Sequence, residues 1–178
     1  SPVGPIFDVD KLDWMNGKYI EALSDADFLS RATPYLPASG QEEALRVLAP
    51  HLKTRVKRLK EVCEQVEFLY QGDIDLDAAL FVAKANVEPT PLDALVALEA
   101  TLDAVDNADF TEAGVEAALD AERQRRNWKP GPFYGPLRIA LTGKTRTPPN
   151  FPMLAALGKT RSLARLHEAI ALLTHSPA

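Results

Sequence analysis

This sequence of 178 residues has few cysteines and no long apolar run, and these absences exclude several classes of protein. Its single cysteine, Cys63, excludes an internal disulfide and is compatible with a reducing compartment. No apolar run approaches the roughly 20 residues of a membrane-spanning helix. The first residues also lack the charged and apolar start of a signal peptide. We therefore expect a cytoplasmic protein without a membrane partner.

Catalytic and metal-binding signatures are also scarce. The sequence contains no Gly-rich phosphate loop and no GxSxG turn for a nucleophilic serine. The three histidines lie far apart, with no Cys or His partner at metal-site spacing. The closest approach to a carboxylate pair, Asp73 and Asp75, lies in a predicted turn, where helix capping is the commoner role. We expect no catalytic residue, metal site or cofactor here, so the chain alone should be inactive as an enzyme.

Strand patterns are almost absent, and the sequence predicts an all-α fold of two helical subdomains. An apolar content of 46% is enough for a hydrophobic core. The best candidate for a boundary is the segment 85–91, ANVEPTP, whose two prolines are typical of a linker. We place the first subdomain at residues 1–85 and the second at residues 86–178.

Apolar residues at helical spacing predict the individual helices, with Ser24, Ser39, Thr90 and Thr111 as N-cap residues. The expected ranges are 10–20, 24–33, 39–50, 53–70, 75–84, 90–105, 111–126, 153–158 and 160–173. In the first helix, Leu12, Met15 and Tyr19 are expected to face the core. In the last helix, Arg161 and Arg165 are expected to face outward.

The formal net charge of −5 conceals a strong asymmetry along the chain. Residues 1–122 carry 10 Lys and Arg against 24 Asp and Glu, a charge of −14. Residues 123–178 carry 10 Lys and Arg against one acid, Glu168, a charge of +9. Two explanations are about equally open: the basic part meets a polyanion, or it packs against the acidic part.

Two groups of basic residues stand out within this distribution. The segment 53–60, KTRVKRLK, places five cations together in the acidic part with no acid among them. A solvated face is the usual explanation for such a run, but its position against the local charge trend favours a phosphate or base contact. The second group, Arg123, Arg125 and Arg126, ends a predicted helix. Three cations there exceed what the helix dipole needs.

A third basic segment, 136–151, has the sequence PLRIALTGKTRTPPNF. Its central glycine permits a positive φ, and the double proline stiffens the chain that follows. We expect a rigid, exposed turn between two helices, with Arg138, Lys144 and Arg146 on it. Such a turn can hold a short piece of nucleic acid in one pose.

Three segments are specific enough to indicate a family. They are 7–20, FDVDKLDWMNGKYI, 136–143, PLRIALTG, and 157–161, LGKTR. Their order and spacing resemble those of bacterial glutamyl-tRNA synthetases, which are class I aminoacyl-tRNA synthetases. The resemblance covers essentially the whole chain and points to the C-terminal, tRNA-binding part of these enzymes.

The resemblance implies the helical anticodon-binding cage of a class I synthetase. It implies tRNA(Glu) as the partner, leaves tRNA(Gln) open, and implies no DNA binding. The parent enzyme would ligate glutamate to tRNA with ATP and Mg²⁺ in a catalytic domain that is expected before Ser1. The chain would then be a monomeric fragment that recognises tRNA.

The resemblance also implies roles for individual residues. Arg55, within RVKRL, takes the position of the arginine that reads the third anticodon base. Arg138 takes the position of the arginine at the first base. The resemblance also implies Thr147, Pro148 and Asn150 at the anticodon, and it places Asn16 in the region that contacts the tRNA stem. Positive charge independently adds Lys144 and Arg146 at the anticodon and Arg125 and Arg126 at the tRNA backbone. Trp14 and Tyr19 are expected in the core rather than at the tRNA.

Two other hypotheses fit the sequence. The acidic surplus of residues 1–122 is also typical of a helical protein-interaction module with an acidic face. An anticodon-binding domain of another class I synthetase would share the helical fold. Failure to bind any tRNA would favour the first alternative, and binding to the tRNAs of other amino acids would favour the second.

Overall fold

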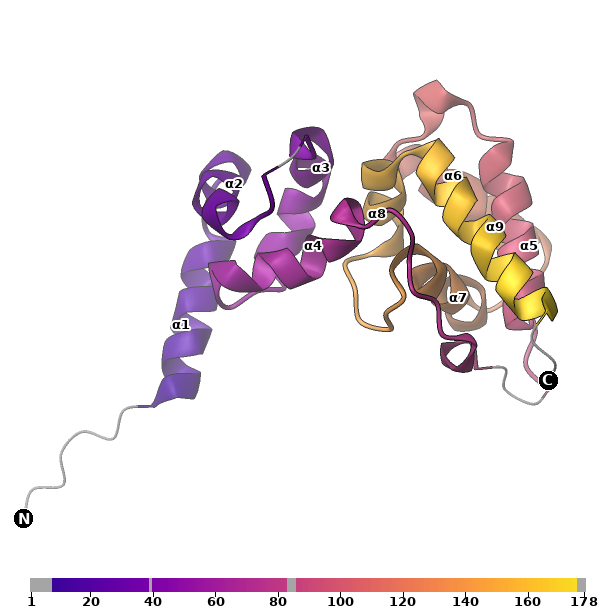
Figure 1. Ribbon diagram of the computed structural model, residues 1–178, viewed down its shortest axis with the longest axis horizontal. Coiled ribbons are helices and arrows are strands. Elements are labelled where there is room, and N and C mark those ends of the chain that lie inside the picture. Colours follow the sequence, from indigo (N-terminus) through magenta and orange to yellow (C-terminus); the bar gives the residue numbers. More distant parts are fainter. Residues whose placement is uncertain (1–7, 39, 83–85, 176–178) are drawn as a thin grey trace, which may run out of the picture. The chain divides into compact units, whose positions relative to one another are not determined.

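Figure 1 shows the computed structural model of the chain, which describes residues 8–38, 40–82 and 86–175. Within these ranges the chain forms nine α-helices, four short 3₁₀ helices and no strand. The predicted all-α fold is therefore confirmed. No helix in the same ranges is both long and apolar enough to cross a membrane.

The helices form two compact units, Ser1–Glu67 and Phe68–Ala178. The division lies before the linker in which the sequence analysis placed it, because residues 68–82 pack within the second unit. The first carbonyls of this segment accept hydrogen bonds from Arg165. Near its end, the side chain of Phe81 is buried.

The first unit is built from short helices. Their bounds are α1 Val9–Glu21, α2 Asp25–Ala32, η1 Thr33–Tyr35, α3 Glu42–Lys53, η2 Leu59–Glu61 and the start of α4 Val62–Tyr70. Ser24 caps α2 by accepting a hydrogen bond from the backbone N–H of Asp27, as predicted. The cap expected at Ser39 lies outside the described residues. Pro50 lies inside α3 without ending it.

The single helix predicted over residues 53–70 is wrong. Helix α3 ends at Lys53 and α4 begins at Val62, with residues 54–58 and η2 between them. Two interactions hold the connecting segment away from helical geometry. Val56 is buried, 3% exposed, and the Glu61 carboxylate accepts hydrogen bonds from the backbone N–H groups of Lys57 and Arg58.

The apolar face predicted for the first helix lies outside the core. Tyr19 is 73% exposed and Trp14 60%, and Leu12 and Met15 are exposed as well. The residue of α1 that is buried is Ile20. Gly17 lies one turn before it, against the backbone at Val56 and Lys57. The side of α1 that carries Gly17 and Ile20 therefore faces the unit, and the apolar strip is turned away from it.

The second unit contains the remaining helices. Their bounds are η3 Ala78–Leu80, α5 Pro91–Asp103, η4 Asn107–Asp109, α6 Glu112–Arg125, α7 Pro130–Thr142, α8 Asn150–Leu157 and α9 Lys159–His175. Helices α5 and α9 run side by side, and α7 packs against both (Figure 1). Thr90 and Thr111 cap α5 and α6 as predicted. Of the helix expected at residues 75–84, only η3 is present in the described chain.

Helix α7 covers residues for which the sequence predicted no helix. Pro130 lies at the first helical position, where a missing N–H costs nothing because no intrahelical partner exists. Phe133 and Leu137 are fully buried, and they hold the helix in place around the internal Pro136. The helix ends at Gly143, whose φ of 68° closes it in the left-handed conformation.

Candidate nucleic-acid interface

Some cations of the first basic loop, residues 54–60, are bound to other parts of the first unit, and others are exposed at its surface. Arg58 donates two hydrogen bonds to the Asp13 carboxylate, at 2.9 and 2.7 Å, and this bond raises the pKa of Arg58. Just before the loop, Lys53 is bound to the Leu23 carbonyl and to Asp25. The side chains of Arg55, Lys57 and Lys60 are exposed and belong to the surface of the first unit.

Arg55 lies on this loop rather than on the predicted helix. Its Nε donates a weak hydrogen bond, 3.3 Å long, to the side-chain oxygen of Gln65 on α4. Arg55 is an exposed residue of the first unit. Because Val56 next to it is buried, the base of the Arg55 side chain is fixed while its tip stays accessible.

Asn16 supports the same loop. Its side-chain amide donates a hydrogen bond to the Lys57 carbonyl, which joins α1 to the first basic loop. Asn16 also borders a groove of about 570 Å³ in the first unit. The other residues that line the groove are Tyr19, Ile20, Leu23, Arg31, Tyr35, Arg58, Leu59 and Lys60. Two exposed tyrosine rings and three cations face this groove, and none of the described residues that line it is a carboxylate.

Most of this groove is not visible in the sequence. Tyr19 was assigned to the core, and Arg31 and Tyr35 carried no signal at all, because each stands alone in the sequence. The groove exists because the ends of α1 and α2 and the first basic loop fold beside one another. Aromatic rings and cations in one groove suit the stacked bases and phosphates of RNA.

The second basic loop, residues 143–149, joins α7 to α8 and begins under tight constraint. A β-carbon at Gly143 would lie 3.0 Å from the Asp75 carbonyl oxygen and 3.1 Å from the Ile74 side chain. The Thr142 hydroxyl accepts a hydrogen bond from the backbone N–H of Lys144, 3.1 Å long. The turn is therefore specific for glycine, and its first residues are rigid.

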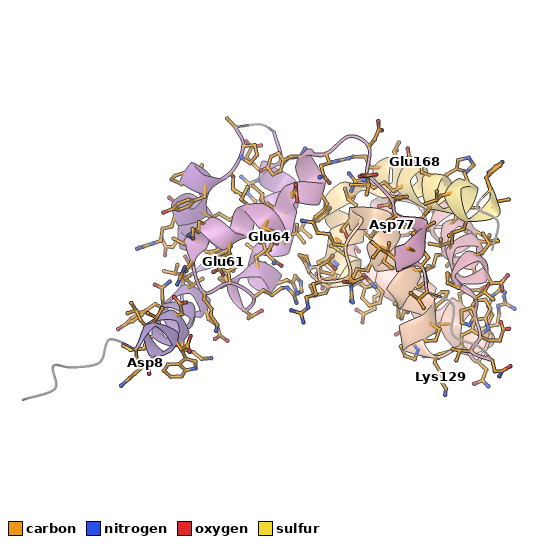
Figure 2. The ribbon with its side chains drawn as sticks, turned by 60° about the horizontal axis from the view of Figure 1, so that its bottom comes forward. Asp8, Glu61, Glu64, Asp77, Lys129 and Glu168 are labelled. Atoms are coloured by element: carbon orange, nitrogen blue, oxygen red, sulfur yellow. The ribbon has the colours of Figure 1, made fainter. Side chains whose placement is uncertain are left out.

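Some of the basic side chains around this loop belong to helix α7, and others belong to the loop itself. Arg138 belongs to α7, not to the turn in which the sequence placed it. It is half-buried, and within the described chain its Nε has no hydrogen-bond partner. Arg146 is exposed on the loop itself, and Lys144 is partly exposed. Lys129, at the start of α7, adds an exposed cation to the same unit (Figure 2).

The three remaining residues implied at the anticodon are buried. Thr147 is 6% exposed and Asn150 is 7% exposed, and Pro148 is buried between them. The Asn150 amide donates a 3.1 Å hydrogen bond to the Tyr134 carbonyl on α7. In this structure these residues form the frame of the second basic loop rather than its contact surface.

The arginines at the end of α6 are held by carboxylates. Arg125 and Arg126 both donate hydrogen bonds to Glu122. These bonds, chiefly the one from Arg125, lower the pKa of Glu122 to about 2. Arg126 also lies over the Trp128 ring, 4.6 Å from its centre. Arg123 is bound to Asp120. These arginines therefore stabilise the second unit, although Arg125 stays 65% exposed.

The cations at the start of α9 are used inside the fold, which corrects the prediction that Arg161 and Arg165 face outward. We call Lys159, Arg161 and Arg165 the capping cations. Lys159 donates to the carbonyls of Asp103 and Val105 at the end of α5. Arg165 is 3% exposed, and burial lowers its pKa to about 10. Much of the positive charge of residues 123–178 therefore neutralises helix ends.

Known structures share this helical arrangement. A crystal structure of a glutamate–tRNA ligase from Elizabethkingia meningosepticum matches with a TM-score of 0.76 at 20% identity, over 94% of this chain and 33% of that one. A glutamate–tRNA synthetase from Elizabethkingia anophelis matches with a TM-score of 0.74 at 18% identity, over 93% of this chain and 32% of that one. At such identities the likeness defines the fold alone, which is that of a helical part of a larger protein.

Sequence relatives define the family. A glutamate–tRNA ligase from Acidothermus cellulolyticus is 39% identical over 97% of this chain and 36% of its own length. One from Thermus thermophilus is 38% identical over 94% of this chain and 36% of its own length. The chain thus spans about a third of the length of these relatives. Residues 27–170 match the anticodon binding domain family, and the chain belongs to that family.

Proposed function

We propose that this chain is the anticodon-binding region of a glutamate–tRNA ligase and that it recognises tRNA(Glu). The observation that carries the proposal is the membership of residues 27–170 in the anticodon binding domain family. The relatives that match nearly the whole chain bear the name glutamate–tRNA ligase. The exposed cations of the two basic loops supply the chemistry that such a function needs.

An anticodon suits these loops for a physical reason. Proteins read RNA sequence mainly from unpaired bases, because the deep groove of an RNA helix hides the base edges. An arginine whose backbone is held in place can donate hydrogen bonds from its guanidinium to two acceptors on the edge of one nucleobase. The ammonium group of a lysine cannot do this with the same geometry. Arg55 is such a residue in the first unit, and we assign it to the third anticodon base. Arg138 is its counterpart in the second unit, and we assign it to the first base.

The other residues serve phosphates or the frame. Lys57, Lys60, Lys144 and Arg146 are placed to meet the phosphates of the RNA backbone, which set orientation without reading sequence. Thr147, Pro148 and Asn150 hold the second basic loop. In this proposal the longer protein ligates glutamate to tRNA(Glu) with ATP and Mg²⁺, and catalysis resides outside the 178 residues. The role of these 178 residues is to bind RNA through their cation-rich loops.

The test is a filter-binding titration of the chain at low salt with RNA hairpins. One hairpin carries the glutamate anticodon, and three others each carry a substitution at one anticodon position. We expect weak binding, with a dissociation constant above micromolar, and a preference for the glutamate hairpin. Equal affinity for all four hairpins would contradict the proposal, and a glutamine anticodon added to the set shows whether tRNA(Gln) is also accepted.

A helical protein-interaction module is the second candidate function, favoured by the charge of −14 on residues 1–122. The same titration separates it from the first. A chain that binds none of the hairpins at any salt concentration, yet retains a protein partner, would be such a module.

A further inference from the structure

The buried side chain of Arg165 makes an unusual set of contacts in the second unit. Its Nη1 donates a 2.6 Å hydrogen bond to the Leu141 carbonyl, and its Nη2 donates 2.8 Å hydrogen bonds to the carbonyls of Phe68 and Gln71. No carboxylate in the described chain accepts a hydrogen bond from it. The one acid of residues 123–178, Glu168, lies on an exposed part of α9 (Figure 2).

These three carbonyls belong to two chain segments that Arg165 joins. Leu141 lies in the last turn of α7, two residues before Gly143, and Phe68 and Gln71 lie at the end of α4. A charged donor between helix C-termini is favourable, because the last carbonyls of a helix lack intrahelical partners and carry partial negative charge. The planar guanidinium can serve both segments at once, since its terminal nitrogens point in different directions.

The joined segments set the start of the second basic loop. After the end of α4, the chain continues to Ile74 and Asp75, which lie against Gly143 so closely that a β-carbon there would be 3.0 Å from the Asp75 oxygen. Thr142 then positions the N–H of Lys144. A shift of the α4 end relative to the α7 end would therefore move the whole loop that follows.

We infer that Arg165 is a positioning residue that sets the pose of residues 143–149 and thereby controls discrimination at the first anticodon base. The inference rests on the proposed function, and it assigns to a buried side chain a role in specificity. Arg146, on the loop, would hold the RNA backbone so that the first base meets Arg138 of α7, and Arg165 acts only through the loop backbone that carries Arg146.

Arg161 offers a matched control on the same helix. Its Nη2 donates to the carbonyls of Leu69 and Gln71, at 2.8 and 3.2 Å, but it makes no hydrogen bond to α7. Arg161 therefore holds the end of α4 without joining it to the loop. A role in stability alone would make the two arginines alike, whereas a role in positioning separates them.

The experiment compares Arg165→Lys and Arg161→Lys in the full 178-residue chain, with hairpins altered at the first or at the third anticodon base. For Arg165→Lys, we expect discrimination at the first base to fall at least about fivefold and discrimination at the third base to change less than about twofold. For Arg161→Lys, we expect both to stay within about twofold of the parent. Amide NMR signals of residues 144–146 should shift in the first variant and not in the second.

A second variant keeps the test decisive if Arg165→Lys does not fold. Gly143→Ala leaves Arg165 intact but disturbs the same contact with Asp75, so it should lose discrimination at the first base alone. Parent-like discrimination at the first base in a folded Arg165→Lys or Gly143→Ala chain overturns the inference and leaves the proposed function standing. Equal losses at both bases also overturn it. A parent chain that discriminates at neither base overturns the proposed function and the inference together.

Discussion

The capping cations of α9 and the exposed cations of the two basic loops all come from basic stretches of sequence, but they have different roles. The side chains of Lys159, Arg161 and Arg165 donate hydrogen bonds to backbone carbonyls at helix ends. Arg55 and Arg146 are exposed and can meet a polyanion. The difference shows that local positive charge does not by itself mark an RNA surface: what decides is whether an acceptor of the fold lies within reach.

The largest effect should come from removing a capping cation. Arg165→Met removes the donor to the buried carbonyls of Leu141 and Phe68, while the Gln71 carbonyl keeps Arg161, and each such loss costs about 1–3 kcal/mol. We expect the free energy of unfolding to fall by at least about 2 kcal/mol in urea denaturation. The matched Arg146→Met variant removes an exposed cation and should change stability by less than about 0.5 kcal/mol. Similar stability of the two variants would erase the contrast between the two groups.

A loop cation should affect recognition instead of stability. Arg55→Ala should cost about 1–3 kcal/mol of discrimination at the third anticodon base, because a bidentate donor is lost. The free energy of unfolding should stay nearly unchanged. Arg46→Ala is the control, since Arg46 is also an exposed arginine of the first unit and is paired with the exposed Glu43. If both variants lose discrimination equally, Arg55 has no special role.

A substitution of Glu122 would free Arg125 and Arg126 from their internal partner and so add them to the cations that are available to RNA. Arg125 and Arg126 lower the pKa of Glu122 from 4.5 to about 2, so the stabilisation is complete above pH 4.5 and is lost as the pH falls toward 2. Glu122→Gln should therefore cost about 1 kcal/mol at pH 7, after allowance for the exposed arginines, and close to nothing at pH 2.5. Urea titrations at both pH values measure this difference.

The same variant should bind RNA more tightly than the parent at low salt, by about two- to threefold, because two arginines lose their internal partner. This gain should disappear at high salt. Unchanged binding would mean that the end of α6 lies away from the RNA, which contradicts the backbone contacts expected from the sequence for Arg125 and Arg126.

The smallest effect should come from a single phosphate contact. Lys57→Ala should weaken binding to every hairpin by the same few-fold factor and reduce the slope of log affinity against log salt by about 0.7. Lys18→Ala, which removes an exposed lysine paired with Glu21, serves as the control. A loss confined to one anticodon sequence would show that Lys57 reads a base.

How far the sequence could predict the site depended on the range of the interactions involved. The motif around Arg138 and the basic run around Arg55 were visible as local patterns. The burial of Thr147 and Asn150 was not, because it arises from α7 and α8 closing over the loop. The groove beside Tyr19 and Tyr35 was invisible for the same reason: its residues come from separate segments.

The sequence by itself determined the all-helical fold, the caps at Ser24, Thr90 and Thr111, and the positive φ of Gly143. Each of these depends on neighbours within about four residues, so the pattern is complete in the local chain. Only the tertiary structure decided that the apolar strip of α1 stays exposed and that Arg165 is buried. Such outcomes depend on which surfaces and carbonyls distant segments bring together, and no local pattern records that.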